Sequence, residues 1–145
     1  MQTIVYAPGV WDLLHVGHVH FLRMAKSLGD KLVVGVPEDT VVYEDKGECP
    51  IIPCRDRIEM LSAIKHVDLA IPYFYLEFLI HLNMVNPDIL VIGEHWGKEK
   101  RHTDAENFMH QKGGRIVRLP YYRGESTTLI KQRIHRTQYE LHEPQ

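Results

Sequence analysis

The stretch "GVWDLLHVGH" (residues 9–18) stands between an apolar run typical of a β-strand and a segment with helical spacing. The run before it is "TIVYA" (residues 3–7). The segment after it is "HVHFLRMAKSLG" (residues 18–29), in which apolar residues recur on one helical face. A strand, a glycine-containing loop and a helix in this order predict the start of an alternating α/β chain.

This alternation continues toward the C-terminus. We expect further strands at residues 31–36, 68–72, 88–93 and 115–120, and further helices at residues 53–67, 74–85, 103–113 and 126–134. The expected capping residues are Gly29, Pro53, Thr103 or Asp104, and Ser126 or Thr127. Because the strands are apolar on both faces, the sequence predicts an α/β fold, with a Rossmann-like parallel five-stranded sheet and helices on both faces.

The composition is that of one globular domain. Of 145 residues, 44% are hydrophobic and 25% charged, and we assign residues 1–137 to the domain and residues 138–145 to a polar C-terminal tail. A net charge of -2 argues against nucleic acid or an anionic membrane as a partner. No apolar run approaches the roughly 18 residues of a membrane-spanning helix, and the N-terminus does not resemble a signal peptide.

The two cysteines, Cys49 and Cys54, match neither a redox pair nor a zinc site in their spacing. We therefore interpret them as reduced thiols and expect a cytoplasmic protein.

Three segments follow expected strands and should meet at one edge of the sheet. They are residues 9–18, residues 93–97 and residues 121–128. Ligands of parallel sheets bind beyond the carboxyl ends of the strands, where the strand order reverses. We expect the functional site at this edge.

His15, Gly17 and His18 fall where the first helix should start. A helix N-terminus has unpaired N–H groups and attracts phosphate, and Gly17 would let the backbone approach a ligand closely. Two imidazoles one turn apart could then donate to the same ligand. Caps or solvent contacts are an alternative, and a metal site that includes His20 is a weaker one, since no cysteine or carboxylate motif accompanies the histidines.

The whole string resembles the G-[TVC]-[FW]-D-x-x-H-x-G-H signature of the cytidylyltransferase-like nucleotidylyltransferases. The resemblance covers roughly residues 3–135 and includes "NPDILVIGEHWG" (residues 86–97) and "GESTT" (residues 124–128). Within the family, "GEHW" (residues 93–96) is most similar to the glycerol-3-phosphate cytidylyltransferases. The family also includes adenylyltransferases for heptose phosphate, phosphopantetheine and flavin mononucleotide.

The resemblance implies roles for individual residues. His15 and His18 would hold the nucleotide phosphates and stabilise the leaving pyrophosphate, and Lys46, expected in the loop after the second strand, would bridge the acceptor phosphate and the α-phosphate. A solvated loop lysine is the alternative for Lys46. The implied nucleotide-binding residues are Gly9, Val10, Trp11, Gly17, Gly93, Glu94, Trp96, Arg123, Gly124, Ser126, Thr127 and Thr128.

The resemblance also implies Mg²⁺ that accompanies the nucleoside triphosphate, no protein-bound metal, and a homodimer. Trp96 could pack against the base or ribose, or simply fill space.

Three positions depart from the family pattern. The arginine of the cytidylyl pattern would fall at Tyr121, whereas Arg123 lies two positions further on. Residues 73–83 contain no lysine or arginine for the acceptor phosphate, and Val10 stands where threonine is common. The first departure weakens CTP as the nucleotide, and the second weakens glycerol 3-phosphate as the acceptor.

Three other charged residues, Asp12, Arg57 and Lys65, have expected roles outside the phosphate site. Asp12 is expected to orient the signature loop, because an ionised acceptor phosphate needs no base. Arg57 and Lys65 fall in the second expected helix, where the family often has basic residues near the nucleotide or the dimer contact. An exposed helix residue is an equal alternative for Lys65.

These observations predict an enzyme that joins a nucleoside triphosphate to a phosphorylated small molecule and releases pyrophosphate. CTP is narrowly favoured by "GEHWG" (residues 93–97), with an ATP-dependent adenylyltransferase of heptose-phosphate or flavin type as the alternative. A non-catalytic nucleotide-binding module is a further alternative.

Overall fold

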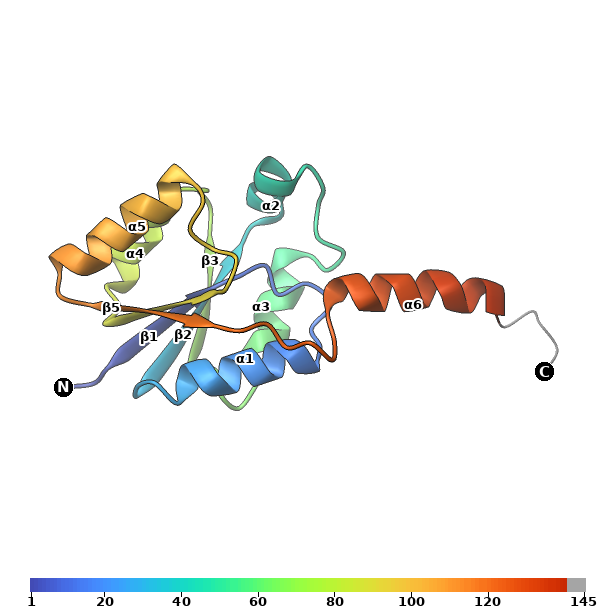
Figure 1. Ribbon diagram of the computed structural model, residues 1–145, viewed down its shortest axis with the longest axis horizontal. Coiled ribbons are helices and arrows are strands. Elements are labelled where there is room, and N and C mark those ends of the chain that lie inside the picture. The colour runs from blue at the N-terminus through green and yellow to red at the C-terminus, as the bar shows by residue number, and fades with distance from the viewer. Residues whose placement is uncertain (141–145) are drawn as a thin grey trace.

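The structure, a computed structural model, describes residues 1–140, and side chains as far as residue 136. Its five parallel strands lie in the order β3-β2-β1-β4-β5 (Figure 1). They are β1 (Ile4–Pro8), β2 (Lys31–Pro37), β3 (Leu69–Tyr73), β4 (Ile89–Gly93) and β5 (Arg115–Leu119). The predicted Rossmann-like sheet is confirmed. The strand order reverses between β1 and β4, which places the expected ligand crevice at their carboxyl ends.

Helices cover both faces of the sheet (Figure 1). They are α1 (Val16–Lys26), α2 (Asp39–Lys46), α3 (Cys54–Ser62), α4 (Phe78–Val85), α5 (Lys100–Gln111) and α6 (Thr127–Glu140). Helices α1 and α3 pack on one face, and α4 and α5 pack on the other.

Alternate residues of the central strands supply the two cores. In β1, Val5 and Ala7 point toward α1 and α3, whereas Tyr6 points toward α4 and α5. All three are fully buried. Burial of both strand faces explains why these strands read as continuous apolar runs.

Helix α2 was not predicted, and the structure therefore corrects the position of Lys46. That residue is the last of α2, not part of a loop. Only Val41 and Val42 of α2 are buried, so the helix carries too few apolar positions to show a period in the sequence.

Several predicted boundaries also move. Helix α3 ends at Ser62 and not at residue 67, because the chain continues as turns whose N–H groups bond three residues back, up to Val67. Helix α4 starts at Phe78 and not at residue 74. Ser27, not Gly29, caps the end of α1, and Glu99, not Thr103 or Asp104, caps the start of α5.

The C-terminal helix extends past the expected end of the domain. The boundary placed at residue 137 falls inside α6, and residues 141–145 of the expected tail lie outside the described residues. Figure 1 shows α6 pointing away from the sheet. Within residues 1–140, no helix is both long and apolar enough to cross a bilayer.

Candidate active site

A cavity of about 630 Å³ opens at the carboxyl ends of the strands, at the reversal of strand order. Three expected segments meet there, as the fold requires. Twelve of the residues implied by the family pattern line it: Gly9, Val10, Trp11, His15, Gly17, His18, Lys46, Gly93, Trp96, Ser126, Thr127 and Thr128. Glu94, Arg123 and Gly124 do not line it.

The two signature histidines are held by backbone N–H groups at the start of α1. His15 is the N-cap, and its Nδ1 accepts the N–H of Gly17 at 3.0 Å. His18 Nδ1 accepts the N–H of His15 at 3.2 Å, and the two rings stack with centroids 3.8 Å apart. Since Nδ1 is an acceptor in both rings, each neutral imidazole carries its proton on Nε2. Capping and ligand donation therefore use different nitrogens of the same ring.

Both histidines are biased toward the neutral form. Burial, followed by the neighbouring His15, lowers the pKa of His18 to about 4, against an opposing effect of Asp12. Burial also lowers the pKa of His15, and Glu125 acts in the opposite direction. At neutral pH the pair presents two neutral Nε2–H donors.

The loop that precedes the histidines is strained and tightly held. Trp11 and Leu13 have positive φ angles of 61° and 50°, a region that side chains other than glycine rarely adopt. Trp11 Nε1 donates to Gly35 O at 3.0 Å, and its ring lies edge-on to His18 at 5.6 Å. Trp11 therefore holds the loop in place and packs against the ring of His18.

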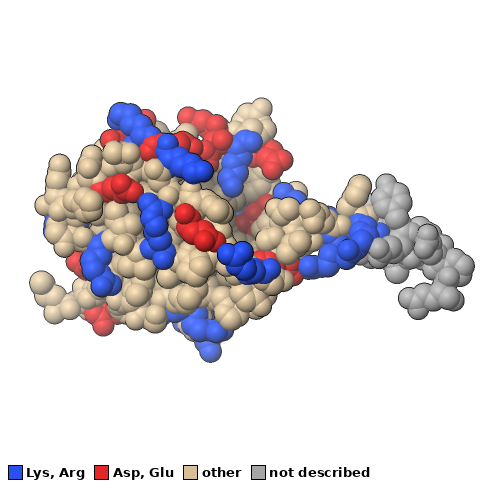
Figure 2. Space-filling model, in the orientation of Figure 1, with Lys and Arg blue, Asp and Glu red and all other residues tan. Residues whose placement is uncertain are grey.

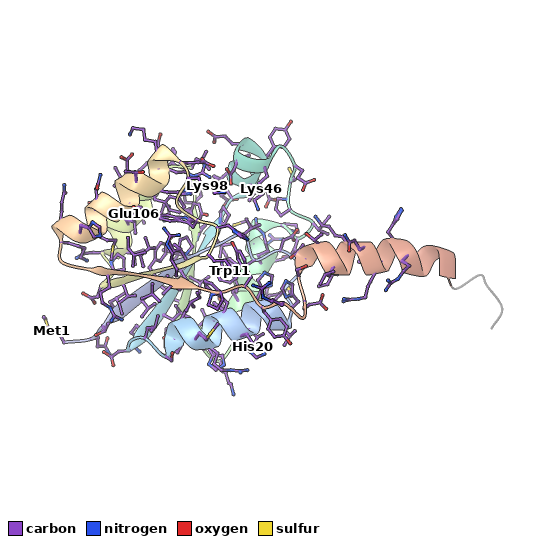
Figure 3. The ribbon with its side chains drawn as sticks, viewed as in Figure 1. Met1, Trp11, His20, Lys46, Lys98 and Glu106 are labelled. Carbon is purple, nitrogen blue, oxygen red and sulfur yellow. The ribbon has the colours of Figure 1, made fainter. Side chains whose placement is uncertain are left out.

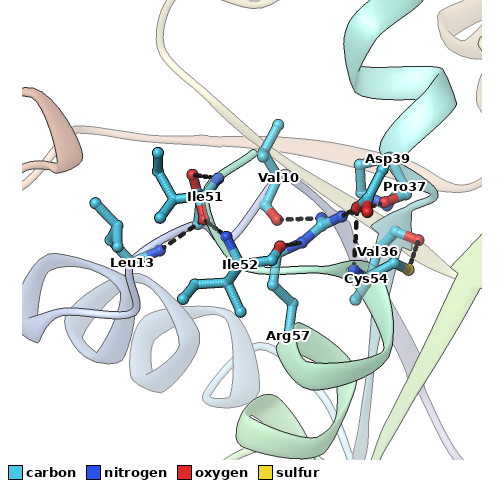
Figure 4. Close-up of polar contacts among 10 residues, drawn as sticks. Val10, Leu13, Val36, Pro37, Asp39, Ile51, Ile52, Cys54 and Arg57 are labelled. Carbon is cyan, nitrogen blue, oxygen red and sulfur yellow. Dashed lines mark hydrogen bonds and ion pairs between the residues drawn. The ribbon is translucent and has the colours of Figure 1, made fainter. Parts of the chain in front are cut away.

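Asp12 holds the same loop through its carboxylate. It accepts the N–H groups of Leu13, Ile51 and Ile52 at 3.1, 2.8 and 2.9 Å (Figure 4). A carboxylate with both oxygens occupied by backbone donors orients the chain, as the sequence predicted for this residue.

Gly17 is required for a different reason from the one expected. A Cβ at this position would lie 2.8 Å from the His15 ring and 3.2 Å from the carbonyl of Glu125. The glycine therefore makes room for the ring of His15 and for the segment that leads into α6, rather than only for a ligand.

The start of α6 lines the same cavity and lies next to the start of α1. Ser126 Oγ accepts the N–H of Leu129 at 3.0 Å, which confirms Ser126 as the N-cap. Thr127 Oγ1 donates to Asp12 O at 3.0 Å, so this hydroxyl ties α6 to the signature loop. The N–H groups of Thr127 and Thr128 come too early in the helix to have intrahelical acceptors, and they are suited to an anion.

Arg123 does not take the place of the arginine missing from the family pattern. Its side chain is exposed at a bend between β5 and α6 and does not line the cavity. Tyr121 lines the cavity instead and packs so closely on Gly93 that a Cβ there would lie 2.6 Å from its hydroxyl. Glu94 accepts the N–H of Tyr121 at 3.2 Å and braces this end of the sheet.

Arg57 and Lys65 lie apart from the cavity. Arg57 is 1% exposed and donates to Val10 O, Ile52 O and Pro37 O and to Asp39 Oδ1, all within 2.8 Å (Figure 4). It braces the loops next to the site, one of which carries the cavity residue Val10. Lys65 follows the end of α3 and is exposed.

Aromatic rings from β3, α4, α5 and the segment between β4 and α5 also line the cavity, and of these the sequence predicted only the tryptophan at residue 96. The rings are those of Tyr73, Phe78, Trp96 and His102. The Trp96 ring lies 4.2 Å from His102 and 5.6 Å from Phe78, so it packs against these rings from α4 and α5. Besides Trp96, the aromatic-rich segment at residues 73–78 was the signal in the sequence for this group of rings.

The charges around the cavity are mixed in sign. Glu125 lines it but is paired with Arg133 at 2.8 Å, whose hydrogen bond lowers the pKa of the carboxyl. Figure 2 shows basic and acidic residues interspersed over the visible face. Among the described residues, no three metal-ligating side chains group together, and His20 stacks on Tyr122 with centroids 4.6 Å apart.

Comparison with known proteins identifies the family. The family model described as Cytidylyltransferase-like matches residues 6–133. The chain belongs to the cytidylyltransferase-like family. It is a nucleotidylyltransferase, as the signature at residues 9–18 predicted.

Two relatives illustrate which proteins this chain is similar to. The FAD synthase of Thermococcus onnurineus (strain NA1) is 42% identical over 136 residues, which cover 90% of this chain and 89% of that protein. The bifunctional protein HldE of Magnetococcus marinus (strain ATCC BAA-1437 / JCM 17883 / MC-1) is 35% identical over 92% of this chain, which spans 27% of that longer protein.

A solved structure agrees with both the family and the fold. The lipopolysaccharide core biosynthesis protein from Thermoplasma volcanium GSS1 is 32% identical, with a TM-score of 0.73. The match covers 84% of this chain and 99% of that one. The two chains therefore share the fold over almost the whole length of the neighbour.

Proposed function

We propose that this chain is an ATP-dependent adenylyltransferase and that its acceptor is flavin mononucleotide. The reaction would be ATP plus flavin mononucleotide giving FAD and pyrophosphate. The sequence narrowly favoured CTP and held ATP as the alternative. The similarity to FAD synthase over 90% of the chain, together with the missing cytidylyl arginine at Tyr121, supports ATP.

The group of aromatic rings in the cavity lining is the observation that carries the choice of acceptor. A flavin is a planar aromatic ring system, and Tyr73, Phe78, Trp96 and His102 provide aromatic surface for it. A sugar phosphate would instead need hydrogen-bonding groups for its hydroxyls. In the proposal the histidines and the start of α6 form the phosphate end of the cavity, and these rings form its aromatic end.

The chemistry follows from the phosphate end. An oxygen of the acceptor phosphate attacks the α-phosphorus in line, the new P–O bond forms as the bond to the β-phosphate oxygen breaks, and pyrophosphate leaves. His15 and His18 would donate their Nε2–H groups to the phosphate oxygens, together with the N–H groups at the start of α6. Lys46 would neutralise charge between the acceptor phosphate and the α-phosphate.

Mg²⁺ would enter as part of the nucleotide substrate. Three of the four carboxylates that line the cavity, Asp12, Asp45 and Glu125, are bonded to protein donors, and no three metal-ligating side chains group together among the described residues, which does not suit a resident cation site. Mg²⁺ is commonly bound through substrate phosphates and water. No step above depends on a protein-bound metal.

Heptose phosphate is a second candidate acceptor. The similarity to HldE and to the lipopolysaccharide core biosynthesis protein supports it. We also propose that the protein forms a homodimer, and only the family resemblance supports this.

A pyrophosphate-release screen tests the proposal. ATP and CTP are each combined with flavin mononucleotide, a heptose phosphate and glycerol 3-phosphate, and nucleotide products are identified by mass. We expect FAD from ATP and flavin mononucleotide, with ATP preferred over CTP by at least about tenfold in kcat/KM, which corresponds to roughly 1.4 kcal/mol. Activity only with a sugar phosphate, or a preference for CTP, would contradict the proposal. Nucleotide binding without turnover for any pair would favour a non-catalytic module.

A further inference from the structure

Helix α2 carries Lys46 at its end and has little apolar contact with the rest of the fold. It is eight residues long, and only Val41 and Val42 are buried. After Lys46, Gly47 ends the helix in a left-handed conformation with φ 78°. Eight residues are too few for a helix to be stable by itself, so its position depends on contacts at its ends.

Both ends of α2 are held by an aspartate that pairs with an arginine from another helix. At the start, Asp39 pairs with the buried Arg57 of α3 at 2.7 Å. At the end, Asp45 pairs with Arg101 of α5 at 2.8 Å. Asp45 is the direct neighbour of Lys46 in the chain, so this second pair lies next to the lysine.

The pair at the end of α2 is partly shielded from water and lines the cavity. The Arg101 side chain is 12% exposed and that of Asp45 is 29% exposed. Both residues line the cavity beside Lys46. Figure 3 labels Lys46 at the end of α2, which the pair of Asp45 with Arg101 joins to the first turn of α5. Partial burial makes such a pair stronger than an exposed one.

A second carboxylate, besides that of Asp45, orients the Arg101 side chain. It lies in the first turn of α5, where its guanidinium also contacts Glu99 at 3.2 Å. Its planar, permanently charged fork can hold two carboxylates at once. Its Nη1 and Nη2 atoms therefore already have carboxylate partners, and only its buried Nε is without a hydrogen-bond partner in the described part of the chain.

We propose that Arg101 and Asp45 form a clasp between α5 and α2 that positions Lys46 for phosphate transfer. Arg101 is then a positioning residue, and Lys46 is the group that meets the substrate. The inference rests on the proposed function for the role of Lys46. The clasp itself is a property of the unliganded protein and can be tested without substrate.

Hydrogen–deuterium exchange is the substrate-free test. In Arg101→Gln we expect the amides of residues 43–47 to exchange at least about tenfold faster than in the unchanged protein, with the amides of α1 unaffected. Lys100→Gln is the matched control, because it removes only the exposed pair of Lys100 with Asp104 on the same helix. Equal exchange at residues 43–47 in all three proteins would overturn the clasp.

Kinetics separate positioning from direct contact. With whichever substrates give product, Arg101→Gln and Asp45→Asn should lower kcat by a similar factor of about 10 to 100, with KM for the nucleotide within about twofold. The reversed pair, Arg101→Asp with Asp45→Arg, should restore most of kcat and the slow exchange. In Lys46→Ala, adding Arg101→Gln should change kcat no further.

Each outcome has a distinct meaning. A large loss in Arg101→Gln together with full activity in Asp45→Asn would show that the guanidinium acts on the substrate directly, and would overturn the positioning role. A protein that is inactive with every substrate pair would remove the proposed function, while the exchange experiment would still decide the clasp.

Discussion

Two imidazoles at the start of α1 show how backbone N–H groups at a helix end can orient side chains toward a phosphate ligand. The N–H groups of His15 and Gly17 occupy the Nδ1 atoms of the pair, which leaves Nε2–H for a ligand. Burial keeps the rings neutral, so they donate without carrying charge of their own. Donors fixed in advance cost no reorganisation when charge develops on phosphate oxygens.

Replacing either histidine should remove catalysis more than folding. We expect His15→Ala and His18→Ala each to lower turnover by about 10²–10³, as loss of a preorganised donor does. Steady-state kinetics measure this, with circular dichroism as the check on folding. His20→Ala is the control, because His20 stacks on Tyr122 and does not line the cavity. Near-normal turnover in both site variants would show that the histidines are not the phosphate donors.

The elements around the site are joined by buried polar contacts rather than by apolar packing alone. Arg57 of α3 donates to the carbonyls of Val10, Ile52 and Pro37, and so ties together the loop after β1, the end of β2 and the segment before α3. These contacts lie behind the strained signature loop, where Trp11 and Leu13 have positive φ angles. Such strain persists only where the surrounding structure over-determines the backbone.

Loss of Arg57 should therefore be costly to the fold. In Arg57→Met we expect the free energy of unfolding to fall by about 3–5 kcal/mol, because Asp39 and three carbonyls lose a shared charged donor. Urea denaturation measures the change. Arg55→Met, on the same helix with a side chain 95% exposed, should stay within about 0.5 kcal/mol. Equal effects of the two substitutions would mean that the Arg57 contacts contribute little.

The pH dependence of the stability of the whole molecule should include a contribution from His81, a buried histidine outside the site. His81 of α4 is 3% exposed, and its Nδ1 lies 2.6 Å from the hydroxyl of Tyr6 in β1. Burial lowers the pKa of His81 to about 4. Between pH 6.5 and pH 4 the unfolded chain binds a proton at this residue that the folded chain does not bind. Stability is therefore complete above pH 6.5 and is lost as pH falls toward 4.

This pH dependence can be measured in the unfolding free energy. Each pKa unit corresponds to about 1.4 kcal/mol, so we expect a clear loss of stability between pH 7 and pH 5. His81→Leu should be less stable at pH 7, because the Tyr6 hydroxyl loses its hydrogen-bond partner, but its free energy of unfolding should fall less on acidification. An equally steep pH dependence in this variant would show that other groups control it.

The sequence by itself determined the alternating α/β fold and the place of the candidate phosphate-binding residues. Both follow from local patterns, because buried parallel strands read as apolar runs, and the signature places His15 and His18 directly where a strand gives way to a helix. The N-cap at Ser126 was predictable for the same reason, since capping depends on a few adjacent residues.

Only the tertiary structure decided which other residues reach the cavity. Arg101 and Asp45 are 56 positions apart, and Trp96 meets rings from α4 and α5. No local period encodes such contacts, because they depend on how helices pack across a sheet. For the same reason the sequence placed Lys46 in a loop, whereas Lys46 is the last residue of a short helix that distant contacts hold. The sequence also predicted that Arg123 binds the nucleotide, whereas Arg123 is exposed at a bend and does not line the cavity.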